Sequence, residues 1–240
     1  CPFTHNLREN LKAMLSILNG PIAVRSSSIL EDSQSLSFAG IYTTHMLPNN
    51  DLSFDIRLEE LESAIKCVYA SVFCENSRKF MANTPFSVED ESMAVIVQEI
   101  VGRQRGTKFY PHISGVATSH NYYPIGNQKP EDGVAVVALG LGHTVLHGGR
   151  ALRFSPGSPE ILPQFSSASE YSVKTQRCFF GVDMTQTRVD FLTNRESGIA
   201  EYSIADAEKD GTFALVGSVY CLDDDQLKEN FKLPGPRVVS

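Results

Sequence analysis

One arginine at the end of a β-branched run, followed by three serines, is the segment whose residue types best suit chemistry. This segment is Ile22–Ser28, with the arginine at Arg25. The run predicts a strand over residues 22–26. The planar fork of a guanidinium matches phosphate oxygens, and neighbouring hydroxyls and backbone N–H groups can complete such a cradle. We therefore predict that Arg25, Ser26 and Ser27 bind a polyphosphate.

A polar loop follows this segment and closes on Phe38, Ala39 and Gly40. It also carries acidic residues, so a second interpretation stays open. In that alternative Arg25 is a surface residue that pairs with Glu31 or Asp32 beside a solvated serine turn.

A second segment, Val95–Gly102, reads as a strand that leaves the core beside a glycine. The end of such a strand can present backbone groups to the edge of a purine. Gln98 and Glu99 could reach an amino group or ribose hydroxyls, while Ile100 and Val101 could form the wall of an apolar ring pocket. The alternative is a core strand that simply runs out to the surface.

A third segment, residues 138–153, combines clustered glycines with two arginines, Arg150 and Arg153. Glycines let a backbone approach phosphates closely, and the arginines add positive charge. The segment lacks the Gly-Lys-Ser/Thr ending of a Walker A loop and the glycine spacing of a dinucleotide fingerprint. His143 and His147 stand four apart, so a helix would place both on one face, as in a two-histidine metal site. Packed or capping histidines are the alternative.

The net charge and the composition exclude some classes of binding partner. The 240 residues carry 21 basic and 28 acidic side chains, for a net charge of −7, which argues against nucleic acid or an anionic membrane as partner. No apolar run approaches the ~20 residues of a membrane span, and no signal-peptide pattern opens the chain. The five cysteines form no C-x-x-C motif, which favours a reducing cytoplasm. Cys67 and Cys74 are expected to share one face of a helix.

The pattern along the chain predicts an α+β fold, with a largely antiparallel sheet flanked by helices. The apolar spacing of residues 7–18 predicts a helix with Thr4 as its N-cap. A long helix is expected over residues 56–73, supported by a Glu62–Lys66 pair one turn apart. Further strands are expected at 40–47, 93–101, 112–119, 133–139, 179–182, 188–191 and 213–222.

A cluster of Pro, Gly and Ser at residues 156–163 suggests a boundary. We predict a nucleotide-binding region over 1–160 and a small β-rich part over 161–240. The chain begins with Cys and ends where another strand is expected to start, so we interpret it as part of a longer polypeptide.

The order of these segments carries more information than each one alone. Val-Arg-Ser-Ser, Ser-Phe-Ala-Gly, Val-Gln-Glu-Ile-Val, Ser-Gly-Val-Ala and Leu-Gly…Gly follow one another over residues 22–153. This order resembles the nucleotide-binding region of phosphoenolpyruvate synthases and pyruvate phosphate dikinases. The resemblance implies an ATP-grasp type of domain, in which two lobes clamp ATP. It also implies that Arg25 contacts the ATP phosphates as a catalytic residue, that Phe38–Gly40 cover them, and that Gln98–Val101 border adenine.

The resemblance further implies Mg²⁺ and other domains of the same full-length chain. In this family the phosphoryl group passes from ATP to a carrier histidine on a separate domain, and then to pyruvate in a third domain. The carrier signature and the pyruvate-binding barrel are absent from this sequence, so we do not expect the chain to complete the reaction by itself.

The sequence departs from the family at the metal site. His143 stands where a glutamate ligand is usual, and His147 where another polar ligand, often Gln, is usual. Imidazole suits Mg²⁺ poorly, because that cation prefers oxygen ligands. An alternative function is therefore a catalytically degenerate nucleotide-binding or interaction module within a larger protein.

Overall fold

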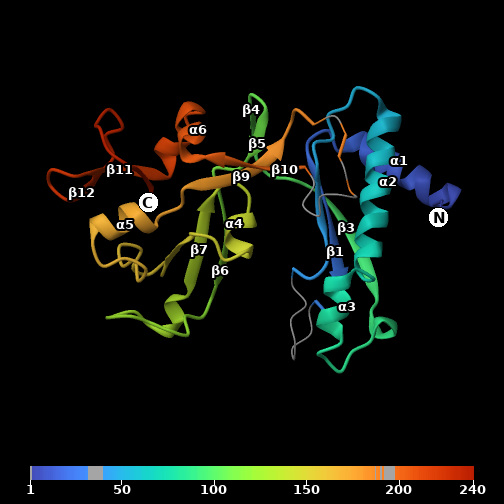
Figure 1. Ribbon diagram of the computed structural model, residues 1–240, viewed down its shortest axis with the longest axis horizontal. Helices are drawn as coiled ribbons and strands as arrows, with labels where there is room; N and C mark the ends of the chain where they lie inside the picture. The colour runs from blue at the N-terminus through green and yellow to red at the C-terminus, as the bar shows by residue number, and fades with distance from the viewer. Residues whose placement is uncertain (1, 32–39, 187, 190, 192–197) are drawn as a thin grey trace. The chain divides into compact units, whose positions relative to one another are not determined.

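The structure is a computed structural model that describes residues 2–31, 40–186, 188, 189, 191 and 198–240 (Figure 1). It confirms an α+β fold, with short helices and mostly antiparallel sheets. The α-helices described are α1 (His5–Ile17), α2 (Phe54–Ser71), α3 (Glu75–Met81), α4 (His143–Leu146), α5 (Ala168–Lys174) and α6 (Ile204–Lys209). The strands described are β1 (Ile22–Ser28), β2 (Thr44–Leu47), β3 (Met93–Glu99), β4 (Arg103–Arg105), β5 (Lys108–Tyr110), β6 (Ile113–Thr118), β7 (Val134–Leu139), β8 (Leu152–Phe154), β9 (Cys178–Asp183), β10 (Ile199–Ser203), β11 (Gly217–Cys221), β12 (Gln226–Lys228) and β13 (Arg237–Val239).

Contacts between residues divide the chain into two compact units. Unit 1 comprises Cys1–Val101, Thr107–Phe109 and Val182–Ile199, and unit 2 comprises Gly102–Gly106, Tyr110–Gly181 and Ala200–Ser240. A further sheet has the strand order β10-β9-β5-β4. The predicted division into a nucleotide-binding region over 1–160 and a β-rich part over 161–240 stays a prediction.

Unit 1 is built on the antiparallel sheet β2-β1-β3. Alternate residues of a strand point to opposite faces, and the apolar ones of β1, Ile22 and Val24, are fully buried. They pack with Leu58, Leu61 and other residues of α2, which runs along this face of the sheet (Figure 1). At about 25 cal/mol per Å² of apolar surface, this burial is the main stabilising contribution in unit 1.

The first helix begins as predicted, because the Thr4 side chain accepts a hydrogen bond from the backbone N–H of Leu7. The long helix expected over 56–73 is interrupted instead. α2 ends at Ser71, and α3 begins after Cys74 as its N-cap. The prediction that Cys67 and Cys74 share one helix is therefore wrong.

The predicted Glu62–Lys66 pair is also replaced by tertiary contacts. Glu62 accepts a hydrogen bond from Arg8 Nε at 2.8 Å, and the Lys66 ammonium lies over the ring of Phe3, 5.0 Å from its centroid. Arg8 comes from α1 and Phe3 from the residues just before it, so both partners are tertiary contacts that spacing within one helix cannot reveal.

A tight approach in unit 1 requires a glycine. Gly198 has φ +84°, and a Cβ on this residue would overlap the carbonyl oxygen of Met46 in β2. Any side chain there would therefore displace the backbone as well as adopt an unfavourable conformation.

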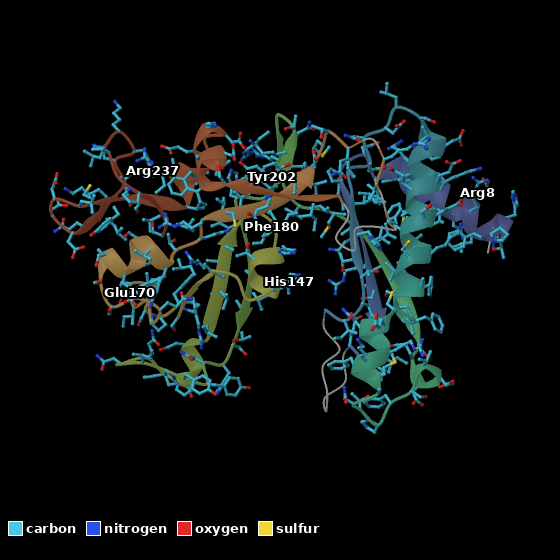
Figure 2. The ribbon with its side chains drawn as sticks, viewed as in Figure 1. Arg8, His147, Glu170, Phe180, Tyr202 and Arg237 are labelled. Carbon is cyan, nitrogen blue, oxygen red and sulfur yellow. The ribbon has the colours of Figure 1, made fainter. Side chains whose placement is uncertain are left out.

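Unit 2 contains the antiparallel sheet β6-β7-β8, with β7 in the middle. A second sheet, β12-β11-β13, packs with α5 through Tyr171, Tyr220 and Val238. Arg237 of β13 anchors this part (Figure 2): its guanidinium donates to both carboxylate oxygens of Glu208 at 2.8–3.1 Å. Such a bidentate pair holds a defined geometry because two parallel bonds form at once.

The sequence-based description of residues 161–240 missed two short helices. Ser167 is the N-cap of α5 and Ser203 that of α6, and the Ser203 side chain forms a capping box with Asp206. That serine-to-acid spacing is a known start signal. Of the strand expected over 188–191, the described residues Arg188, Val189 and Phe191 are not in a strand, and residue 190 lies outside the described part. The strand expected over 213–222 is shorter, since a 3₁₀ turn, Phe213–Leu215, precedes β11.

Among the described residues, no helix combines the length and apolar character that a bilayer span requires. Cys67, Cys74, Cys178 and Cys221 are free thiols, and Cys1 lies outside the described residues.

Candidate functional site

Arg25 lies in β1 on the sheet face opposite to the one that packs on α2. Its side chain is exposed, while its neighbours Val24 and Ser26 are buried on the other face. In register, Arg25 lies between Thr44 of β2 and Ile96 of β3. Directly opposed residues point to the same face, so these three side chains form a row across the sheet.

The serines next to Arg25 are divided between the two faces. Ser27 shares the Arg25 face, whereas Ser26 and Ser28 are buried on the opposite one. Ser26 Oγ donates to one carboxylate oxygen of Glu31 at 2.8 Å, and the Ser28 N–H donates to the other at 2.9 Å.

Glu31 is thus held by two serines. Within the described residues Arg25 has no acidic partner, and Asp32, its other expected partner, lies outside them. An exposed guanidinium without a carboxylate partner is available to an anionic ligand.

Gln98 lies close to Arg25 on the same face. It pairs in register with Ala23, so Gln98 and Arg25 are diagonal neighbours. Such neighbours have Cα atoms about 7–8 Å apart, within reach of one ligand for side chains of this length.

The remaining residues of the second segment differ in their environments. Glu99 ends β3 and is exposed, and Val101 is 84% exposed. The strand expected over 93–101 ends at Glu99. Ile100 is buried, and its N–H donates to the carbonyl of Pro21 at 2.9 Å. The backbone donor of Ile100 is therefore not open to a purine edge.

Of the loop expected to cover the phosphates, Phe38 and Ala39 lie outside the described residues. Gly40 is exposed and has a φ of +78°. A Cβ on Gly40 would have no atom of the described residues within 4 Å.

Behind the Arg25 face, the buried side of the sheet holds a titratable group. His45 of β2 is 1% exposed, and its ring packs edge-on against Phe191 with centroids 5.2 Å apart. Burial lowers the pKa of His45 to about 4, so the imidazole is neutral at pH 7.

In unit 2 the glycine cluster forms a turn from β7 into α4. Gly140 has φ +82°, and a Cβ there would overlap the carbonyl oxygen of Phe180. That carbonyl accepts the N–H of Leu141 at 2.8 Å, so the turn is fixed on β9.

His143 is the first residue of α4 and His147 is its C-cap, and their rings lie next to each other, as their spacing predicts. Their ring centroids are 4.2 Å apart, and the centroid of the His143 ring lies 4.0 Å from that of Phe180. Among the described residues no group of three His, Cys, Asp or Glu side chains is arranged to hold a metal ion. A stacked imidazole pair supplies no oxygen ligand, so these two residues do not fit Mg²⁺.

Gln176 positions the end of β7, and no sequence motif marks it for this role. Gln176 is 3% exposed, and its side-chain oxygen accepts the Leu139 N–H at 2.9 Å. Its amide nitrogen donates to the Leu139 carbonyl at 3.0 Å and to the Cys178 carbonyl at 2.9 Å. Gln176 thereby fixes the end of β7, just before the glycine turn.

Arg153, the last sequence-predicted residue, belongs to unit 2, whereas Arg25 and Gln98 belong to unit 1. Arg153 lies in β8 and lines a cavity of about 220 Å³.

Within the described part of the chain, Arg25 and Gln98 thus lie near each other on one face of the sheet, and Arg25 has no acidic partner there. Comparison with known families identifies the class further: residues 1–229 match the model of the pyruvate phosphate dikinase AMP/ATP-binding domain. The chain belongs to this family, which confirms the resemblance seen in the sequence. A search of curated proteins found no match. The chain is therefore an ATP-binding part of a protein similar to phosphoenolpyruvate synthase and pyruvate phosphate dikinase.

Proposed function

We propose that this chain binds ATP in an ATP-grasp type of fold and supplies its phosphoryl group to a carrier histidine on another domain, for later transfer to pyruvate. The observation that supports this proposal is the placement of Arg25 and Gln98 as diagonal neighbours on one open face, in a chain of an ATP-binding family. Cytoplasmic location stays a prediction.

In the proposed mode of binding, Arg25 donates to ATP phosphate oxygens, with Ser27 beside it on the same face. Phosphoryl transfer spreads negative charge over these oxygens, so a fixed guanidinium stabilises the transition state. Ser26 acts indirectly, because it holds Glu31 away from Arg25. The Phe38–Gly40 loop would cover the phosphates, and Gln98, Glu99, Ile100 and Val101 would border adenine.

Mg²⁺ would ordinarily neutralise part of the phosphate charge. Because the stacked His143 and His147 do not fit that ion, we assign no step to a metal held by them.

Titration of the chain with ATP by isothermal calorimetry tests the proposal. We expect Arg25→Ala to weaken ATP binding at least tenfold, since a charge-assisted hydrogen bond contributes about 1.5–3 kcal/mol. Arg78→Ala is the matched control, because Arg78 is an exposed arginine of α3 in the same unit. Absence of ATP binding, or equal affinities for the two variants, would contradict the proposal.

The His143–His147 stack favours a second candidate function, a catalytically degenerate nucleotide-binding module. In this candidate ATP still binds, but no phosphoryl group is transferred. His143→Glu restores the usual family residue. If ATP turnover in the full-length protein is zero with either residue, the degenerate module is favoured, whereas native turnover eliminates it.

A further inference from the structure

A cavity in unit 2 is not used by the proposed function. It has a volume of about 220 Å³, and residues of β8, of the loop after β6 and of the segment around Gln164 line it. Of the described residues that line it, none is acidic, and Arg153 is the one with a charged side chain.

Arg153 is held in place through its backbone. Its N–H donates to Gln164 Oε1 at 2.8 Å, and Gln164 Nε2 donates to the Ala151 carbonyl at 2.9 Å. The described part of the chain contains no acidic partner for the Arg153 guanidinium. A cation in a partly enclosed space without a counter-charge favours an anionic ligand.

Two buried polar groups of the same lining also lack partners. Ser155 is 2% exposed, and its Oγ has no hydrogen bond in the described structure. Gln128 Oε1 accepts from the N–H of Ile125 at 3.2 Å and from Asn121 Nδ2 at 3.5 Å, which fixes the orientation of the amide. Gln128 Nε2 is then a buried donor that has no partner. Buried donors without partners are unfavourable, so a ligand that accepts from them after a small side-chain rotation gains affinity.

The other walls of the cavity are apolar or aromatic, from Tyr123, Ile125 and Phe154. The volume lies below the ~300–1,000 Å³ of sites that enclose drug-sized ligands. We propose that this cavity binds a small organic oxyanion, a carboxylate or phosphate monoester on a single apolar ring or short chain. Arg153, Gln128 and Ser155 donate to the oxyanion, and Arg153 then serves this ligand instead of the ATP phosphates expected from the sequence.

Titration of the 240-residue chain with benzoate, phenyl phosphate and benzyl alcohol tests this assignment, with chemical-shift changes in NMR spectra as the readout. We expect saturable binding of at least one of the two anions and no saturable binding of the neutral alcohol. Tighter binding of benzoate would indicate a carboxylate ligand, and tighter binding of phenyl phosphate would indicate a phosphate monoester. Failure of both anions to saturate overturns the proposal.

Two variants locate the bound anion. Arg153→Gln is expected to weaken its binding at least tenfold, whereas Arg103→Gln, an exposed arginine of β4 outside the lining, leaves it unchanged. If Arg153→Gln does not fold, Ser155→Ala provides a second test, with an expected weakening of about threefold. Equal binding by the wild type and by these cavity variants overturns the proposal.

Competition with ATP separates this proposal from the nucleotide site. We expect saturating ATP and the Arg25→Ala variant to leave anion binding unchanged. Stoichiometric displacement of the anion by ATP would assign the cavity to the nucleotide site and overturn this inference, while the proposed function would stand. Anion binding without any ATP binding would support this inference and contradict the proposed function.

Discussion

In each unit, one arginine has no acidic partner among the described residues, but the two arginines lie in different surroundings. Arg25 projects from the exposed face of the sheet β2-β1-β3, whereas Arg153 lines a cavity of about 220 Å³ beside β8. An exposed cation attracts any polyanion and is screened by salt, because water surrounds it. A cation in a cavity also selects by size and by the polar groups around it. The two units thus offer two kinds of anion recognition from the same residue type.

The units also stabilise their sites differently. In unit 1, Glu31 is satisfied by two serines behind the Arg25 face. In unit 2, Gln176 holds the end of β7, while Ser155 remains unsatisfied in the cavity lining. The following changes test this contrast.

The largest expected effect comes from Gln176→Met, which keeps the side-chain volume but removes three hydrogen bonds. The N–H and carbonyl of Leu139 would remain buried without partners, at a cost of about 3–5 kcal/mol. Urea unfolding measures the total loss, and hydrogen exchange should locate it in unit 2. Gln104→Met, on an exposed residue of β4, should change the stability by less than about 0.5 kcal/mol.

A pH-dependent loss of stability is expected from unit 1, because burial lowers the pKa of His45 from 6.5 to about 4. The unfolded chain binds a proton below pH 6.5, whereas the folded chain does so only near pH 4. Stability is therefore complete above pH 6.5 and decreases as the pH falls toward 4. We expect a loss of about 2 kcal/mol between pH 7.5 and pH 5 from this residue.

Urea unfolding at both pH values, with His45→Phe, measures this contribution. The variant should be less sensitive to acid than the wild type, while His5→Gln, on an exposed residue of α1, should behave like the wild type. Identical acid sensitivity of His45→Phe and wild type would show that His45 does not carry the effect.

The smallest expected effect compares two buried serines. Ser26→Ala removes the hydrogen bond to Glu31 and should destabilise the protein by about 1–2 kcal/mol. Ser155→Ala removes a hydroxyl without a partner, so it should be neutral or stabilise the protein by up to about 1 kcal/mol. Chemical denaturation of both variants provides the comparison, and a greater loss for Ser155→Ala would contradict it.

Local signals were sufficient where an element depends on its own residues. Thr4 marks the start of α1, and the β-branched run that begins at Ile22 marks β1. The short helix α6 carried a start signal at Ser203, but its six residues gave too little periodicity for a prediction. The apolar stripe over 56–73 continued past the true end of α2, because a stripe does not show where a helix is interrupted.

The candidate site was predictable only in part. Arg25 was identified from its fork of donors and the serines after it. The spacing could not show that Ser26 turns toward Glu31 and away from the Arg25 face. Gln176 was missed, since a lone glutamine shows its role only when it meets the backbone of β7.

The sequence by itself determined the α+β class and the family, because these follow from residue types, their periodicity and their order. It also named candidate phosphate-binding residues, which stay a prediction. Only the tertiary structure decided that Arg25 and Gln98 share one face of a sheet. The physical reason is register: pairing of Ala23 with Gln98 sets which face each side chain occupies, and a shift by one residue would place them on opposite faces.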